Sequence, residues 1–174
     1  HGVPDKKAFK EGDIVSVDVG FFYKGFHTDT SFTASIGKAS KETLKFLDAG
    51  KKALKESVRQ VRPGRKMSAI SKKMQEILEE RGYSPVRALT GHGIGRELHE
   101  EPHIPCFWEP RLKDEIIPEG AVFAIEVIYT LGLPDLILST DDNWTISTKD
   151  GKIAALFEET VAVTKTGPEV LTAT

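Results

Sequence analysis

Two stretches of the sequence, EGDIVSVDVG at residues 11–20 and EGAVFAIEVI at residues 119–128, align with each other without a gap. Each begins with Glu-Gly, continues as the apolar run of a β-strand and carries an acid, Asp18 or Glu126, at the same position. Each half also has a later strand pattern in which a threonine follows an acid: Asp29-Thr30 in the first half and Glu158-Glu159-Thr160 in the second. A repeat of this kind indicates two related half-domains packed around a shared centre.

Strand and helix patterns fill most of the remaining chain. Alternating or continuous apolar residues predict strands at 13–22, 26–36, 120–131, near 143–147 and at 153–164. Tyr23-Lys24-Gly25 predicts a tight turn that joins the first two strands into a hairpin. Helical spacing predicts one helix from the N-cap Ser40 to about Val61, and a second from about Met67 to a stop at Gly82. We expect no regular element in TGHGIGRELHEEPHIP (90–105), which glycines interrupt, or in PDLILSTDD (134–142).

The composition excludes several classes of protein. A chain of 174 residues with 39% hydrophobic and 29% charged residues is typical of a soluble globular domain. The net charge of -2 does not favour nucleic acid or an anionic membrane as the main partner. No apolar run is long enough to span a membrane and no signal peptide is visible. Cys106 is the only cysteine, so we expect no disulfides and a cytoplasmic location. Without a coiled-coil pattern, a monomer is expected.

Four acids on strand patterns are candidates for a common site: Asp18, Asp29, Glu126 and Glu158. A carboxylate among apolar residues is costly unless it is paired or binds a metal. Taken singly, each acid could equally lie on an edge strand and face water. Taken together at one centre they would repel one another, and two divalent cations would cancel their charge.

The segment GHGIG (91–95) contains a second kind of candidate ligand. His92 lies between glycines, which permit close approach of the backbone to another group, and neutral imidazole is the commonest nitrogen ligand of transition metals. His99 follows inside HEEP. It could be a metal ligand, a hydrogen-bond donor to a substrate or a turn residue, and the sequence spacing leaves these alternatives open. Trp144 is expected to contribute to packing or to the wall of a pocket.

In their order along the chain, the acid hairpin, GHGIG, HEEP, FAIE and FEET closely resemble the methionine aminopeptidase family of pita-bread metallopeptidases. The most specific segments are GFHTDTS (25–31), GHGIGRELHEEP (91–102) and DNWTISTKDGKIAALFEETVAVT (142–164). The resemblance implies an α+β pita-bread fold, in which two pseudo-symmetric halves form a curved antiparallel sheet covered by helices. It implies one catalytic domain over 1–174, with halves at roughly 1–85 and 86–174, that lacks an N-terminal segment of the family.

The resemblance also implies roles for individual residues. The five metal ligands of the family correspond to Asp18, Asp29, His92, Glu126 and Glu158. Glu159 is adjacent to Glu158, but neighbouring strand residues point to opposite faces, so only one of them can be a ligand. The substrate-contacting histidines of the family correspond to His99 and to His1, which begins the HGVPD motif. Leu98 replaces a phenylalanine that normally lines the methionine pocket.

The activity implied is removal of the N-terminal methionine from peptides and nascent proteins by a hydroxide held between two divalent metal ions. Glu126 would transfer protons, His99 would stabilise the oxyanion and His1 would contact the scissile amide. An oxygen-rich site with one histidine favours Mn, Fe or Co over Zn. The expected partners are the N-termini of peptides or nascent chains, with the ribosome as a further candidate.

Two alternatives stay open. One is an Xaa-Pro or other aminopeptidase of the same fold. The other is a non-catalytic pita-bread module that binds peptides, although such modules usually lose metal ligands. The short interval between Glu126 and Glu158 favours a type I enzyme, because type II enzymes carry a long insertion there. Val127 and Thr90 also depart from the residues usual in bacterial members, which are proline and cysteine.

Overall fold

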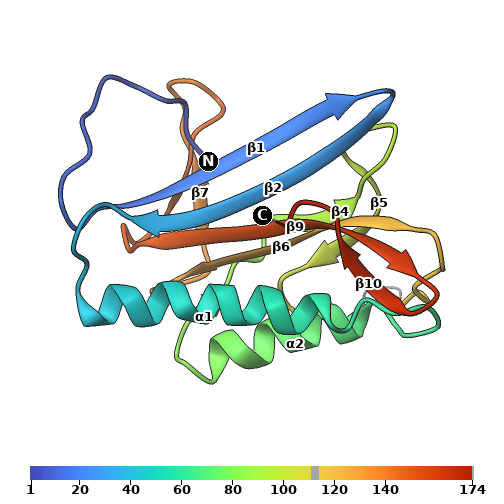
Figure 1. Ribbon diagram of the computed structural model, residues 1–174. Helices are drawn as coiled ribbons and strands as arrows, with labels where there is room; N and C mark the ends of the chain where they lie inside the picture. The colour runs from blue at the N-terminus through green and yellow to red at the C-terminus, as the bar shows by residue number, and fades with distance from the viewer. Residues whose placement is uncertain (111–113, 174) are drawn as a thin grey trace.

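The computed structural model describes residues 1–110 and 114–173 (Figure 1). In chain order the elements are β1 (Ile14–Tyr23), β2 (Phe26–Ser35), α1 (Lys41–Val58), α2 (Ser68–Glu79), β3 (Ser84–Pro85), β4 (Thr90–Gly93), β5 (Glu100–Pro105), β6 (Val122–Thr130), β7 (Leu136–Leu138), β8 (Ile146–Thr148), β9 (Ala154–Thr164) and β10 (Gly167–Val170). No helix in this part of the chain is long and apolar enough to cross a membrane.

One eight-stranded antiparallel sheet forms the main layer. Its strands run in the order β1-β2-β9-β6-β4-β5, while β10 pairs with β9 and β3 pairs with β6. Strands β7 and β8 form a separate two-stranded sheet. The order places β2, from the first half of the sequence, beside β9, from the second half. The two halves therefore meet in the middle of the sheet.

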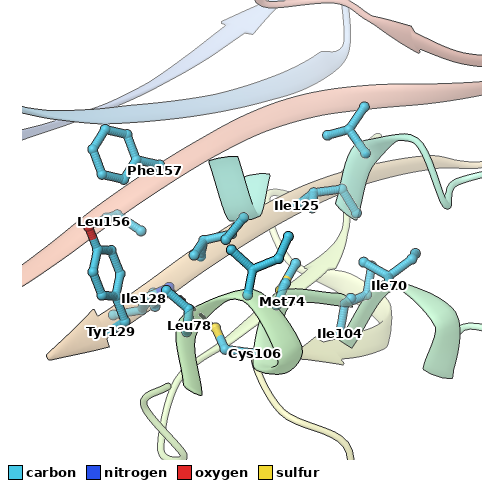
Figure 2. Packing of buried hydrophobic residues seen from close by; sticks show 14 of the residues in the cluster. Ile70, Met74, Leu78, Ile104, Cys106, Ile125, Ile128, Tyr129, Leu156 and Phe157 are labelled. Carbon is cyan, nitrogen blue, oxygen red and sulfur yellow. Dashed lines mark hydrogen bonds between the residues drawn. The ribbon is translucent and has the colours of Figure 1, made fainter. Parts of the chain in front are cut away.

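Helix α1 lies against β6 and β9, and α2 packs against α1, β3 and β5 (Figure 1). Ser40 caps α1, because its side chain accepts a hydrogen bond from the backbone N–H of Thr43, as the sequence predicts. Gly50 allows α1 to lie directly on the sheet, since a Cβ there would come within 2.5 Å of Phe157. Figure 2 shows the resulting core, in which Met74 and Leu78 of α2 belong to the same buried cluster as Ile125 of β6.

The structure corrects three predictions of secondary structure. Helix α1 ends at Val58 rather than at about Val61. The segment 90–105 is not irregular, because it contains β4 and β5, and the segment 134–142 contains β7. Strand β4 has the sequence TGHG and shows no apolar alternation, but it is paired on both sides, with β5 and with β6. Its strand conformation comes from these long-range partners and not from local preference.

The two halves differ in the cover on the outer face of their strands. Ile125 and Val127 of β6 point toward the helices and are fully buried. Val17 and Val19 occupy the matching positions of β1 and are 39% and 37% exposed. The exposed apolar face of the hairpin continues through Phe21, Tyr23, Phe26 and Phe32. Among the described residues, helices therefore cover this face of β6 but leave the matching face of β1 exposed.

Candidate metal centre

The hairpin of β1 and β2 brings the first two acids to one face of the sheet. Lys24 and Gly25 both have positive φ values, 50° and 88°, which is the geometry of a tight hairpin turn. The register that follows pairs Gly20 with Asp29, and Asp18 with Ser31. Asp18 and Gly20 lie two residues apart on β1 and therefore share a face. Because directly paired residues share a face, the Asp18 and Asp29 side chains point to the same side.

Strands β6 and β9 bring the other two acids to the same side. Glu126 and Glu158 are direct partners in the antiparallel register. Glu158 is also the partner of Ser31 in β2, at the point where the two halves join, and it is only 2% exposed. Glu159 points to the opposite face, where its carboxylate accepts a hydrogen bond from the hydroxyl of Thr172. The structure therefore places Glu158, and not Glu159, among the clustered acids.

His92 reaches the cluster from β4. Its Nε2 lies 3.4 Å from Oε1 of Glu126, and its Nδ1 lies 2.9 Å from the carbonyl oxygen of Gly93. Because a carbonyl oxygen only accepts, Nδ1 carries the hydrogen in this bond and Nε2 is left to accept a proton or bind a metal. The backbone of residue 93 thus fixes the orientation and the tautomer of the ring.

Glycine is required on either side of His92 because neither position has room for a side chain. Neither has a positive φ. A Cβ at Gly91 would lie 2.5 Å from the carbonyl oxygen of Ala124, and one at Gly93 would collide with the carbonyl oxygen of Glu101. Both positions therefore need glycine because the backbone of a neighbouring strand approaches closely, as the sequence predicts.

The ligand atoms converge closely enough for a metal ion. One donor atom from each of Asp29, His92 and Glu158 lies within 4.8 Å of the others. Glu126 joins the group through its contact with His92. Asp18 joins it electrostatically, because its charge acts on both Asp29 and Glu158. All five predicted ligands are thus brought together, from five strands and both halves.

Without a cation, the cluster strongly disfavours its own ionisation. Burial raises the pKa of Glu158 to about 10, and the nearby charges of Glu126, Asp29 and Asp18 add to the effect. Burial likewise raises the pKa of Asp18 and of Asp29. At His92 burial lowers the pKa, but the Glu126 carboxylate and the Gly93 carbonyl outweigh it, and the net shift of the pKa is upward.

The residues present fit divalent cations. Among the described residues, Oε1 of Glu158 is a buried oxygen with no hydrogen-bond partner. A buried carboxylate oxygen without a donor is costly, and a cation would satisfy it. Four carboxylates and one imidazole, mostly oxygen donors, suit a hard or borderline divalent metal.

The predicted substrate residues lie around this cluster. The His99 ring packs edge-on against His92, with ring centroids 4.5 Å apart. Nδ1 of His1 lies 3.8 Å from Oδ2 of Asp18, and the carbonyl oxygen of His1 accepts a hydrogen bond from the N–H of Ile146. Leu98 lies against Gly20, close to Asp29. His1, His99 and Leu98 therefore each lie beside a member of the cluster: Asp18, His92 and Asp29, respectively.

Trp144 is placed less closely. It lies in the loop before β8, and its side chain is 64% exposed. It stands two residues from Ile146, the hydrogen-bond partner of His1. The expected packing role is wrong for Trp144, because an indole this exposed is not part of the core. A role in the wall of a pocket stays a prediction.

Comparison with known proteins agrees with this geometry. Residues 1–165 match metallopeptidase family M24, and the chain belongs to this family. Its similar relatives include the methionine aminopeptidase of Aquifex aeolicus, which is 41% identical over 99% of this chain and 67% of that protein. The crystal structure of methionine aminopeptidase from Rickettsia prowazekii matches with a TM-score of 0.94 at 36% identity, over 99% of this chain and 69% of that one.

Solved structures of other peptidases also resemble this chain. Prolidase from Pyrococcus furiosus matches with a TM-score of 0.79 at 26% identity, over 100% of this chain and 45% of that one. The α+β pita-bread fold expected from the sequence is confirmed by these neighbours. The chain spans about two thirds of the length of the curated methionine aminopeptidases it matches.

Proposed function

We propose that this chain is a metalloaminopeptidase that removes N-terminal methionine from peptides, and that Asp18, Asp29, His92, Glu126 and Glu158 hold two divalent metal ions. The observation that carries the proposal is the convergence of these five side chains from both halves onto one face of the sheet. The methionine aminopeptidase relatives support the substrate class.

The chemistry divides between the metal ions and the protein. Two divalent cations, when bound, lower the pKa of a water molecule toward neutrality and polarise the substrate carbonyl. Glu126 is the side chain best placed to take and return a proton, because it is partly accessible and already in contact with His92. His99, exposed beside His92, would donate a hydrogen bond to the developing oxyanion. His1, at the rim beside Asp18, would contact the amide of the scissile bond.

A peptide panel tests the substrate class. With Mn²⁺ or Co²⁺ present, kcat/KM for Met-Gly-Met is expected to exceed that for Leu-first and Ala-first peptides and for an Xaa-Pro dipeptide by at least about tenfold. A chelator should stop the hydrolysis and added metal should restore it. Faster cleavage of the Xaa-Pro dipeptide would favour the prolidase-like alternative. Metal binding without hydrolysis of any peptide would favour a binding module.

The pKa shifts predict how metal binding depends on pH. In the metal-free protein the pKa of Glu158 is raised from 4.5 to about 10, so this group stabilises the fold below about pH 4.5 and loses that contribution as pH rises toward 10. The upward shifts of the pKa at Asp18, Asp29 and His92 act with the same sign. Bound cations remove the repulsion and compete with protons. The rise in Tm on adding Mn²⁺ is therefore expected to be larger at pH 8 than at pH 6.

Thermal unfolding with and without Mn²⁺ at the two pH values checks this prediction. Glu158→Gln is the control, because glutamine cannot ionise and should flatten the pH dependence of the metal-free Tm. A rise in Tm that is equal or larger at pH 6 would contradict the assignment of these groups as ligands.

A further inference from the structure

The seam between the two halves, where β2 lies beside β9, contains little regular strand pairing. Strands β6 and β9 pair continuously from Val122 to Thr130, whereas β2 and β9 share a single registered pair, Ser31 with Glu158. On both sides of this pair, threonine hydroxyls make the connections that backbone groups make in a regular ladder. The threonines are Thr30 and Thr33 of β2 and Thr160 of β9.

Two of these threonines act on the main chain of a metal-site acid in the opposite half. The Thr160 hydroxyl accepts a hydrogen bond from the N–H of Asp29 at 2.8 Å and donates one to the carbonyl oxygen of Asp29 at 2.7 Å. The Thr30 hydroxyl donates to the carbonyl oxygen of Glu158 at 3.1 Å. The acid-threonine pattern that recurs in both halves of the sequence is thus a reciprocal contact between the halves.

Thr160 is fully buried, so water cannot easily replace its hydroxyl as the hydrogen-bond partner of the Asp29 backbone. If the hydroxyl were removed, both polar backbone groups of Asp29 would lose their partner in a site where water has little access. They could recover a partner only if β2 moved relative to β9. Such a movement would change the separation of Asp29 from Glu158, the two acids that approach most closely with His92.

We propose that Thr160, assisted by Thr30, sets the spacing between the Asp29 and Glu158 carboxylates that two bound metal ions require. These threonines are positioning residues, since they touch the main chain of the ligands and not the reacting atoms. The inference rests on the proposed function, because it assumes that the cluster holds metal. Residues that orient metal ligands typically change metal affinity 10- to 100-fold when they are replaced.

Thr33 supplies a matched control within the same seam. Its hydroxyl accepts from the N–H of Leu156 at 3.0 Å and donates to the carbonyl oxygen of Leu156 at 2.8 Å, which repeats the geometry of Thr160. Thr33 is also buried, but its partner Leu156 is not a metal ligand. Thr33→Val and Thr160→Val therefore remove the same pair of backbone contacts, near a non-ligand and near a ligand. Thr33→Val also removes a hydrogen bond to the hydroxyl of Ser16 at 2.7 Å, so its cost in Tm should be at least as large.

The test compares wild type, Thr160→Val, Thr160→Ser and Thr33→Val by Mn²⁺ titration calorimetry, by the EPR signal of a spin-coupled Mn²⁺ pair and by Tm. Both valine variants should lower Tm. Only Thr160→Val should weaken binding of the second Mn²⁺, by about 10- to 100-fold, and diminish the coupled signal. Thr160→Ser should restore the binding to within about threefold of wild type, because it restores the hydroxyl.

The outcomes separate the proposed clamp, which is the positioning of Asp29 by Thr160 and of Glu158 by Thr30, from the proposed function. Wild-type Mn²⁺ affinity and an intact coupled signal in Thr160→Val would overturn the clamp alone. An equal loss of Mn²⁺ binding in Thr33→Val would also overturn it, because the seam would then act as a general support. If wild type bound no Mn²⁺, the proposed function and the clamp would both fall. If wild type bound two Mn²⁺ without cleaving methionyl peptides, only the proposed function would fall.

Discussion

Replacement of Glu158 by glutamine is expected to reduce kcat/KM for Met-Gly-Met by at least about a hundredfold and to abolish binding of one Mn²⁺. The change keeps the size of the side chain and removes only its charge. Even residues that merely support metal ligands change metal affinity or activity 10- to 100-fold when replaced, and loss of a ligand should cost more. Glu158 is the most buried of the four acids and feels the charges of the other three.

Glu159→Gln is the matched control for this experiment. The two glutamates are neighbours on β9, but Glu159 faces away from the cluster and binds the hydroxyl of Thr172. Its replacement should leave kcat/KM within about threefold of wild type, since a neutral amide can still accept that hydrogen bond. Equal losses in the two variants would show that the assignment of faces is wrong. Calorimetric titration with Mn²⁺ and steady-state assays of both variants decide the matter.

The second large effect is expected from Gly93→Ala. An added methyl group would collide with the carbonyl oxygen of Glu101 in β5, and backbone atoms cannot rotate out of the way. Strand β4 would have to move away from β5 and carry His92 with it. We expect a loss of about 3 kcal/mol in the free energy of unfolding, the upper range for overpacking, and at least about a hundredfold weaker Mn²⁺ binding.

Gly95→Ala provides the comparison two residues later. The three atoms nearest to a Cβ at Gly95 all belong to the carboxylate end of Glu100, the closest at 3.0 Å, and that flexible side chain can move. Urea unfolding and Mn²⁺ titration of both variants give the measurement. Gly95→Ala should stay within about 1 kcal/mol of wild type, a size typical of surface substitutions. Unfolding free energies that did not differ between the two variants would contradict the close approach at Gly93.

Sequence analysis identified the five clustered side chains because their signals are local. Asp18 and Glu126 stand at the same position of a repeated strand pattern, and a carboxylate among apolar residues is conspicuous without any knowledge of its neighbours. His92 is marked by its two glycines. The hairpin and both helices follow from turn residues and from periodicity, which act over a few residues.

Strands β4 and β5 could not be predicted in this way. TGHG has no alternation of apolar and polar side chains, and its strand form depends on pairing with residues far along the chain. The exposure of Trp144 could not be predicted either, because the burial of a loop residue depends on which distant segments pack over the loop.

Residue types and short spacings were enough to predict which residues form the site, whereas the way these residues face one another depends on the packing of the two halves. The choice between Glu158 and Glu159 depends on the register of β9 against β6 and β2, which sets the face of every residue on the strand. The role of Thr160 depends on hydrogen bonds to Asp29, which is separated from it by most of the chain. Residue types and short spacings are properties of a local segment, whereas the geometry of a site shared by two halves exists only once those halves have packed together.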